Sequence, residues 1–210
     1  MKIAAVIPMK KLHLAKSRLS NILSPQQRKN LAMYLFDATI KELKESNFIS
    51  EIIIVSSDKA VKKYSYNNKL KFIQDFDEGV NHAVILADRY CINNDINANV
   101  VIPHDLPFIS AKEIDGICTI SNKYDKCIII CPSKRFDGTN VLFRKPPDVI
   151  MTFYDDNSYM NHLKEAHKFQ IPIVSLDNVN LRFDIDTKED LLELLPIENW
   201  NFVFKDFGIN

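Results

Sequence analysis

Glycine is scarce in this sequence, with four glycines among 210 residues. At an average usage of about 7%, a chain of this length would contain roughly 15. No window therefore supplies the patterns GxGxxG or GxxxxGK[ST], which bind phosphates in Rossmann and P-loop proteins. Any phosphate-binding loop in this chain must work without glycine-rich backbone.

The sequence also lacks a surplus of charge of either sign, because 27 Lys and Arg residues balance 27 Asp and Glu residues. Nucleic acids and anionic membranes need a basic surplus, so neither is expected as the main partner. The 46% content of hydrophobic residues excludes a disordered chain. Any anionic ligand must be held by a local group of charges.

Cysteine pairs and long apolar runs are missing as well. The four cysteines form no CxxC motif, and Cys127 and Cys131 would lie about 13 Å apart on a strand, too far to share a zinc ion. Buried, reduced thiols are expected instead. No apolar stretch approaches the 18 residues of a membrane span, and the short run at Ile3–Ile7 is no signal sequence. These observations predict a cytoplasmic protein.

Short apolar runs alternate with helix-like segments, which predicts an α/β fold with a mainly parallel sheet. Helices are expected from Pro25 to about Glu45, with Ser24 as N-cap, and near 79–91 and 110–122. The expected buried strands are Ile3–Ile7, ended by Pro8, then Glu51–Ser56, Lys71–Gln74, Val100–Pro103 and Cys127–Cys131.

After residue 131 the alternation loosens, which predicts a small insertion or excursion from the sheet. Further expected elements are a short strand at Asn140–Arg144, a helix at Ser158–Lys168, a strand at Ile171–Ser175 and a helix capped by Thr187 with Asp190. No repeat, low-complexity tract or linker interrupts the chain. A single domain over residues 1–210 is therefore expected.

Ligands of parallel α/β sheets bind beyond the carboxyl ends of the strands, and the segment after the first strand is basic there. It carries Lys10, Lys11, Lys16 and Arg18 within nine residues. Four cations can neutralise a polyphosphate without help from glycines. A solvated basic loop is the alternative interpretation of this segment alone.

Carboxylates follow two later segments at the same predicted edge. Asp105 follows the strand at Val100–Pro103, and Asp184 and Asp186 precede a helix on an extended stretch that turns both side chains the same way. Such carboxylates are typical ligands of Mg²⁺ beside nucleotide phosphates. A simple turn at Asp105 and a capped turn at Asp184–Thr187 remain alternatives.

Gly138 precedes a hydroxyl and an amide in Phe136-Asp137-Gly138-Thr139-Asn140. This arrangement can direct backbone N–H groups and the Thr139 hydroxyl at an anionic oxygen. A hairpin turn is the alternative.

Five motifs follow one another along the chain: Pro8 with Lys16-Ser17-Arg18-Leu19, Pro103-His104-Asp105-Leu106-Pro107, Asp137-Gly138-Thr139-Asn140, Asn157-Ser158 with His162-Leu163, and Asp184-Ile185-Asp186-Thr187-Lys188-Glu189-Asp190-Leu191. In this order, they resemble those of the 2-phospho-L-lactate guanylyltransferase family of coenzyme F420 biosynthesis over roughly residues 1–195. The resemblance implies a GT-A-like (Rossmann-like), MobA-related three-layer nucleotidyltransferase fold. It also implies transfer of GMP from GTP to 2-phospho-L-lactate, or to phosphoenolpyruvate or 3-phosphoglycerate, with release of pyrophosphate.

The resemblance also implies roles for individual residues. Catalysis falls to Lys16, Arg18 and Asp105, with Mg²⁺ on Asp105, Asp184 and Asp186. The phosphoacid is expected at Thr139, Asp155 and Ser158. The nucleotide is expected at Lys10, Lys16, Arg18, Gly79 and Asn81, although Gly79 and Asn81 fit a helix start equally well. Three departures from the family pattern are His104 for a small residue, Phe136-Asp137 for glycines, and Asp155 for a glycine.

Two other function classes stay open at this stage. One is a different nucleotidyltransferase, which loads guanylate on molybdopterin or cytidylate on a sugar phosphate and would differ in the loops around 137–163. The other is a non-catalytic nucleotide-binding module, which the basic loop and three carboxylates argue against. The expected partners are GTP and a small phosphorylated carboxylic acid, and a homodimer is as compatible with the sequence as a monomer.

Overall fold

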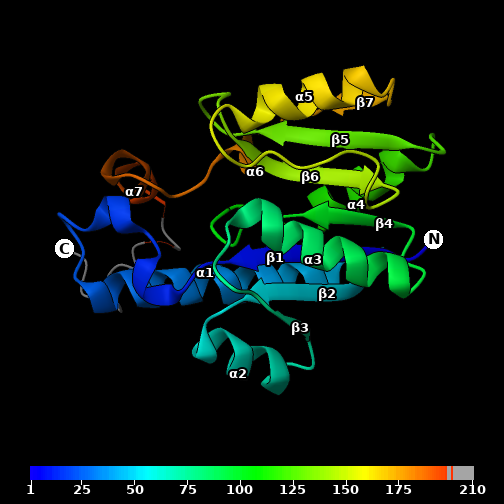
Figure 1. Cartoon of the computed structure of the whole chain (residues 1–210). Coiled ribbons are helices and arrows are strands. Elements are labelled where there is room, and N and C mark those ends of the chain that lie inside the picture. Colours follow the sequence, from blue (N-terminus) through cyan, green and yellow to red (C-terminus); the bar gives the residue numbers. More distant parts are fainter. Residues whose placement is uncertain (198–199, 201–210) are drawn as a thin grey trace.

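The computed structural model describes residues 1–197 and residue 200, which form a seven-stranded sheet covered by helices on both faces (Figure 1). The strands lie in the order β3-β2-β1-β4-β6-β5-β7, and β6 alone among them runs antiparallel to its neighbours. The predicted α/β fold with a mainly parallel sheet is confirmed. The strands are β1 (Ile3–Met9), β2 (Ile49–Ser56), β3 (Lys71–Gln74), β4 (Ala98–Val101), β5 (Cys127–Pro132), β6 (Thr139–Lys145) and β7 (Ile173–Ser175).

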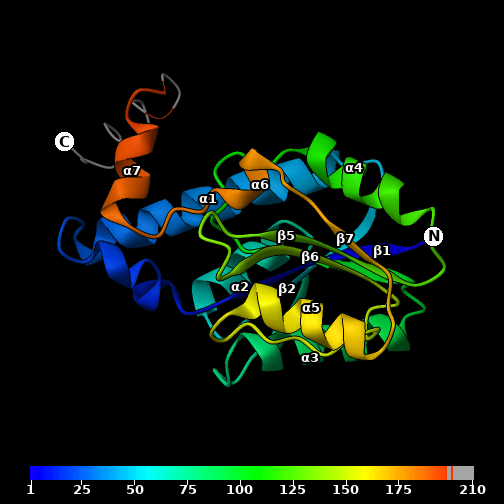
Figure 2. The same ribbon diagram turned by 90° about the horizontal axis from the view of Figure 1, so that it is seen from above.

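Three layers result, because α1 and α4 pack on one face of the sheet while α3 and α5 pack on the other (Figure 2). None of the helices formed by the described residues combines the length and apolar character needed to cross a membrane. The helices are α1 (Pro25–Glu45), α2 (Lys59–Asn67), α3 (Val80–Asn93), α4 (Ala111–Ser121), α5 (Ser158–Lys168), α6 (Val179–Arg182) and α7 (Lys188–Leu194).

Strand β1 lies at the centre of both cores. Ala5 and Ile7 belong to the core under α1 and α4, whereas Ala4 and Val6 belong to the core under α3. Successive strand residues face opposite sides, so a strand buried on both faces needs apolar residues at every position. That requirement explains the uninterrupted apolar run at the start of the chain.

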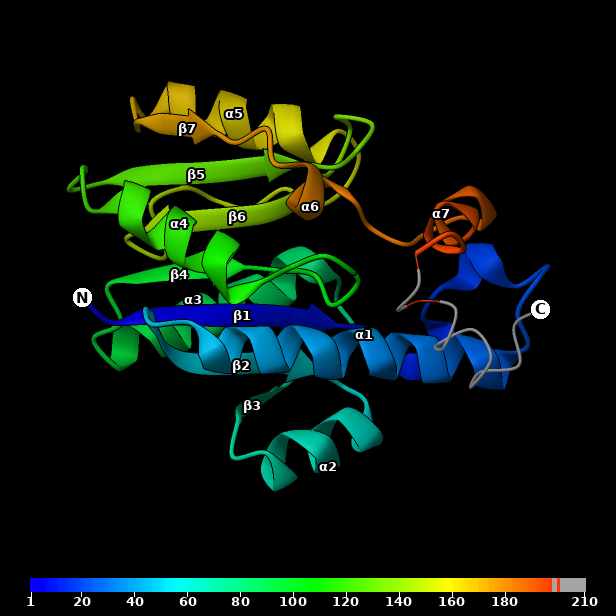
Figure 3. The same ribbon diagram turned by 180° about the vertical axis from the view of Figure 1, so that it is seen from behind.

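Helix α1 begins and ends where the sequence predicts. The Ser24 hydroxyl accepts from the Gln27 N–H, and the Gln27 side chain accepts from the Ser24 N–H, which satisfies two free amides of the first turn. Leu31 and Leu35 on this helix pack with Leu191 and Leu194 of α7, so α7 lies beside the first half of α1 (Figure 3). The capping box of Thr187 and Asp190 that starts α7 is also confirmed.

Six of the seven strands differ from their predicted bounds by one or two residues, and β1 and β4 show why. Strand β1 continues through Pro8 to Met9, because the missing N–H of Pro8 falls on the side where β4 has already ended at Val101. Strand β4 lies two residues earlier than predicted. Ile102 donates the last backbone bond of this pair to Val6, and the chain then leaves the sheet at Pro103.

The expected excursion after residue 131 is wrong, because this segment is a hairpin that stays in the sheet. Strand β6 returns antiparallel between β4 and β5, with Val101 opposite Leu142. The first residues of β6 therefore lie at the same edge of the sheet as the carboxyl ends of β1, β4 and β5. Thr139 and Asn140 reach the functional edge in this way.

Four short elements were not predicted from the sequence. They are α2, capped by the Asp58 side chain, α6, capped by the Asn178 side chain, and a pair of 3₁₀ turns in the basic loop. The predicted state of the cysteines is confirmed, because all four are free and buried.

Candidate functional site

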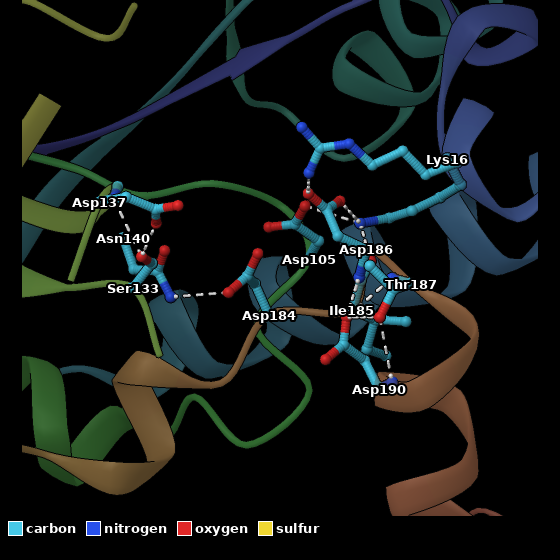
Figure 4. A network of polar contacts seen from close by, with 12 residues as sticks. Lys16, Asp105, Ser133, Asp137, Asn140, Asp184, Ile185, Asp186, Thr187 and Asp190 are labelled. Carbon is cyan, nitrogen blue, oxygen red and sulfur yellow. Dashed lines mark hydrogen bonds and ion pairs between the residues drawn. The ribbon is translucent and has the colours of Figure 1, made fainter. Parts of the chain in front are cut away.

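Lys16 is the centre of a buried charge cluster beyond the carboxyl ends of β1 and β4 (Figure 4). Its backbone is left-handed, with φ 54°, between 3₁₀ turns at Leu12–Leu14 and Ser17–Leu19. Its Nζ atom donates to Asp105 Oδ2 at 2.7 Å, to Asp186 Oδ1 at 3.4 Å and to the carbonyl oxygen of Ile185. An ammonium has three N–H donors, so oxygen atoms of the protein engage all of them.

Three carboxylates surround this one ammonium, and the pKa shifts in the cluster indicate that negative charge exceeds positive charge. Burial opposes the charge of Lys16, yet Asp105 and Asp186 outweigh it and raise the Lys16 pKa. Burial likewise opposes the charge of Asp105, but Lys16 holds the pKa of this carboxyl below its usual value. Burial together with the charges of Asp105 and Asp186 raises the pKa of Asp184 to about 6. The cluster thus holds more negative charge than Lys16 balances.

The four cations of the basic loop do not gather at one point. Arg18 Nη1 donates to Asp186 Oδ2 at 3.1 Å, while 69% of its side chain stays exposed. Lys11 turns away and pairs with Asp77 at 2.7 Å. Lys10 lines the pockets described next. Lys16 and Arg18 therefore share the carboxylate cluster, whereas Lys10 and Lys11 lie apart from it.

Three adjoining pockets follow this edge of the sheet, with volumes of about 350, 370 and 560 Å³. The apolar pocket is lined by Pro8, Met9, Lys10, Leu14, Asp75, Asp77, Gly79, Val80 and Ala83. The central pocket contains Lys16, Arg18, His104, Asp105 and Asp186 and shares Pro8, Lys10, Leu14 and Val80 with the apolar one. The polar pocket shares Arg18, Thr139, Tyr154 and Asp186 with the central one and adds residues of the β5–β6 hairpin and of 155–158.

The apolar pocket has the wall expected for a nucleotide base, but with one difference from the prediction. Gly79 lines it at the start of α3, with φ 95°, a backbone conformation that favours glycine. Asn81 lines none of these three pockets. Its Oδ1 accepts from the Tyr154 N–H at 2.8 Å and its Nδ2 donates to Asp155 Oδ2 at 3.0 Å. Asn81 thus ties α3 to the loop before α5.

The polar pocket gathers the three residues predicted to bind the phosphoacid, Thr139, Asp155 and Ser158. Ser158 is the first residue of α5 and is buried. The Gly138 N–H donates to Ser133 Oγ at 3.0 Å within the hairpin, so the hairpin turn is the interpretation that the structure supports for this glycine. The Thr139 side chain, by contrast, reaches the pocket wall.

Sequence reasoning missed two cations of the polar pocket, Lys134 and Arg135. Both lie in the hairpin, where Lys134 pairs with Glu193 of α7. Their adjacency just before Gly138 is a signal that could have drawn attention to them. Lys134 and Arg135 thus add two cations to a pocket wall that also carries the carboxylates of Asp137, Asp155 and Asp156.

The carboxylate cluster offers only oxygen donors, which hard divalent cations prefer. Within residues 1–197 and residue 200, no three His, Cys, Asp or Glu side chains are arranged to hold a metal ion by themselves. Mg²⁺ in nucleotide sites is typically bound by one or two carboxylates, with phosphate oxygens and water completing its shell. The excess negative charge of Asp105, Asp184 and Asp186 fits this kind of shared site.

His104 adds no positive charge to the cluster. Burial lowers the pKa of its imidazole to about 4, and its Nε2 atom has no hydrogen-bond partner among the described residues. The site as a whole thus joins an acidic cluster to an apolar pocket on one side and to a polar pocket on the other.

Comparison with known proteins points in the same direction. A family model described as guanylyl transferase CofC like matches residues 3–199. The 2-phospho-L-lactate guanylyltransferase of Methanocaldococcus jannaschii is 34% identical, over 100% of this chain and 91% of its own length. The phosphoenolpyruvate guanylyltransferase of Thermobaculum terrenum is 33% identical, over 94% of this chain and 84% of its own length.

Solved structures of lower identity share the fold. A cytidylyltransferase from Leptospira borgpetersenii superimposes with a TM-score of 0.65 at 14% identity, covering 98% of this chain and 94% of that one. A Mycobacterium tuberculosis protein solved in complex with manganese gives a TM-score of 0.59 at 15% identity, covering 94% of this chain and 100% of that one. These similarities support a nucleotidyltransferase-type fold.

Proposed function

Since the chain belongs to the CofC-like guanylyl transferase family, we propose that it transfers GMP from GTP to a small phosphorylated carboxylic acid and releases pyrophosphate. The candidate acceptors are 2-phospho-L-lactate and phosphoenolpyruvate, which its relatives are named for, and 3-phosphoglycerate. The product is a diphosphoguanosine that carries the acid of the acceptor, such as lactyl-diphosphoguanosine from 2-phospho-L-lactate, in the biosynthesis of coenzyme F420.

One observation carries the assignment of the reacting centre. The carboxylate cluster lies where the central and polar pockets meet, because Asp105 lines the central pocket, Asp184 the polar pocket and Asp186 both. The central pocket in turn shares lining residues with the apolar pocket. A guanine base in the apolar pocket and a phosphoacid in the polar pocket would bring their phosphates together there. The reaction needs these two groups to meet.

The chemistry requires little proton transfer from the protein. An oxygen of the acceptor phosphate forms a new bond to the α-phosphorus of GTP, and the bond from that phosphorus to the bridging oxygen of pyrophosphate breaks. The acceptor phosphate is already ionised near neutral pH, so no general base is needed. Catalysis then depends on placing two anions side by side and on balancing their charge.

The residues of the chain divide this work. Carboxylates of the cluster formed by Asp105, Asp184 and Asp186 would hold a divalent cation such as Mg²⁺ together with phosphate oxygens, and this cation would supply positive charge and Lewis acidity. Lys16 keeps the carboxylates together, because its three donors bind protein oxygens. Arg18 and Lys10 keep exposed cationic groups that can reach the leaving pyrophosphate.

A donor and acceptor matrix tests the proposal. GTP, CTP and ATP are each incubated with Mg²⁺ and 2-phospholactate, phosphoenolpyruvate, 3-phosphoglycerate or glucose 1-phosphate, and pyrophosphate release is followed together with product mass. We expect release only with GTP and a phosphoacid, and none with a chelator. Turnover with CTP or with glucose 1-phosphate would instead indicate a sugar-phosphate nucleotidyltransferase. Absence of release in every combination would overturn the proposal.

A further inference from the structure

His162 is a buried imidazole that neither the sequence motifs nor the proposed reaction explains. It lies on α5 one turn after Ser158, and none of its surface is exposed. The Tyr154 ring packs edge-on against it with ring centroids 5.0 Å apart. A buried polar ring must find hydrogen-bond partners, and both of its nitrogen atoms have one.

The two partners fix the tautomer of the ring. The backbone N–H of Phe153 points at His162 Nε2 at 2.9 Å, and a backbone N–H can only donate. Nε2 must therefore be the unprotonated acceptor. A neutral imidazole that is unprotonated at Nε2 carries its hydrogen on Nδ1. Nδ1 lies 3.0 Å from the Thr139 hydroxyl oxygen and donates to it.

The ring stays neutral in its surroundings. Burial, followed by the charge of the nearby Arg144 guanidinium, lowers the pKa of His162 to about 3. Among residues 1–197 and residue 200, no carboxylate is in hydrogen-bond contact with its ring, since its partners are the Phe153 amide and the Thr139 hydroxyl. The hydrogen on Nδ1 is therefore fixed at neutral pH.

This arrangement decides what the Thr139 hydroxyl can do. A hydroxyl has one hydrogen to donate, and the oxygen of Thr139 already accepts from His162. Within the described part of the chain, the hydroxyl makes no second hydrogen bond, and Thr139 lines both the central and the polar pocket. Its hydrogen is left for a ligand there.

We propose that His162 is a positioning residue that acts through Thr139 and presents the Thr139 hydroxyl as a hydrogen-bond donor to an anionic oxygen of the phosphoacid. The inference rests on the proposed function for the identity of this ligand. His162 also holds the loop before α5, because it accepts the Phe153 amide while Asn81 accepts the Tyr154 amide. One buried ring thus connects two walls of the polar pocket.

The first test measures the tautomer without any turnover. Nitrogen NMR of protein labelled with ¹⁵N-histidine should find Nδ1 of His162 protonated and Nε2 unprotonated across about pH 5 to 8. The opposite tautomer, or a His162 that becomes charged in this range, would overturn the proposal. This result does not depend on whether the proposed function is correct.

The second test is a double-mutant cycle. It measures the KM for the acceptor from initial rates and the Kd for phosphoenolpyruvate by calorimetry. His162→Phe and Thr139→Val should each raise both constants about fivefold, with little change in the KM for GTP, and the double variant should be no worse than either. His162→Asn keeps an amide donor near the Nδ1 position and should recover part of the loss. His167→Asn and His167→Phe, on the exposed side of α5, are the matched controls and should change nothing.

The outcomes separate the two proposals. Additive losses in the double variant, or equal losses for GTP and the acceptor, would show that His162 does not act through Thr139. A wild-type chain that uses a donor or acceptor outside the phosphoacid class would overturn the proposed function, while the NMR result would still decide the tautomer. The KM and Kd values are compared only among variants whose melting temperatures match that of the wild-type chain. Where His162→Phe fails to fold, His162→Asn provides the test.

Discussion

Two charge clusters of this molecule differ in their balance of positive and negative charge: one joins β6 to α3, and the other surrounds Lys16 beyond the carboxyl ends of β1 and β4. Arg144 of β6 forms a two-pronged ion pair with Asp88 of α3, at 2.9 and 2.5 Å, and 1% of its side chain is exposed. Asn99 donates a further bond to Asp88 at 2.8 Å. One cation thus meets one carboxylate, with an amide completing the set.

The cluster around Lys16 has three carboxylates for one buried ammonium and one exposed guanidinium. Its excess charge appears in the pKa of Asp184, which burial and the neighbouring carboxylates raise to about 6. Burying like charges costs stability, so such an arrangement is expected where a ligand supplies the missing positive charge. We therefore expect the balanced pair to serve stability and the unbalanced cluster to serve the proposed reaction.

The largest expected effect comes from breaking the balanced pair. Asp88→Asn leaves the Arg144 charge buried beside a neutral amide, which should lower the free energy of unfolding by about 3 kcal/mol. For a chain of this size the melting temperature should fall by roughly 6 to 12 °C. Arg144→Met in the same chain should restore part of this loss, because it removes the unpaired charge. An unchanged melting temperature in Asp88→Asn would contradict the structural role.

Asp105→Asn should do the reverse and remove activity while keeping stability. The change takes one negative charge from the unbalanced cluster, so we expect kcat to fall at least about a hundredfold, or about 2.7 kcal/mol of transition-state stabilisation. The melting temperature should shift little. Asp125→Asn removes the same charge from an exposed position before β5 and is the matched control. Near-normal turnover of Asp105→Asn at saturating Mg²⁺ would reject the cluster as the reacting centre.

Lys16→Met and Arg18→Ala should separate the two cations of the unbalanced cluster. Each variant is expected to lower kcat/KM at least about tenfold. Lys16→Met should also lower the melting temperature, because Lys16 is buried and its loss leaves the carboxylates uncompensated. Arg18→Ala should leave stability unchanged, since Arg18 is mostly exposed. Equal melting temperatures in both variants would place Lys16 outside the buried cluster.

The sequence predicts the fold well where a single local rule decides the structure. The start of α1 follows from the Ser24 cap and Pro25, and β3 and α5 have the predicted bounds, because short-range patterns set them. The place of β6 could not be predicted, since antiparallel pairing between β4 and β5 depends on contacts far apart in the sequence. Pro8 misled the prediction of β1, because only the neighbouring strand decides whether a missing N–H matters.

The sequence predicts which residues form the candidate site better than it predicts the contacts they make. Asp105, Asp184 and Asp186 meet around Lys16 as their positions after strands and before α7 suggested. Lys11 pairs with Asp77, and Asn81 accepts a hydrogen bond from the Tyr154 N–H. Both contacts depend on tertiary packing, which the spacing of residues in the sequence does not reveal. The sequence placed His162 in a motif but predicted no role for it. The role of a buried imidazole depends on its hydrogen-bond partners, which are distant in the sequence.

The smallest effects are expected from the neutral donors of the polar pocket, Thr139 and Ser158. A hydrogen bond from a neutral donor contributes about 0.5 to 1.5 kcal/mol, so Thr139→Val and Ser158→Ala should each raise the KM for the phosphoacid about two- to tenfold. The KM for GTP should stay nearly constant, because both residues line the polar pocket and neither lines the apolar one. Initial rates at varied acceptor and at varied GTP measure both constants. A selective rise in the KM for GTP would exchange the two ends of the site, placing the base beside α5 and the acceptor beside Gly79. The carboxylate cluster would keep its place between them, so this result would change which substrate lies on each side without changing where the phosphates meet.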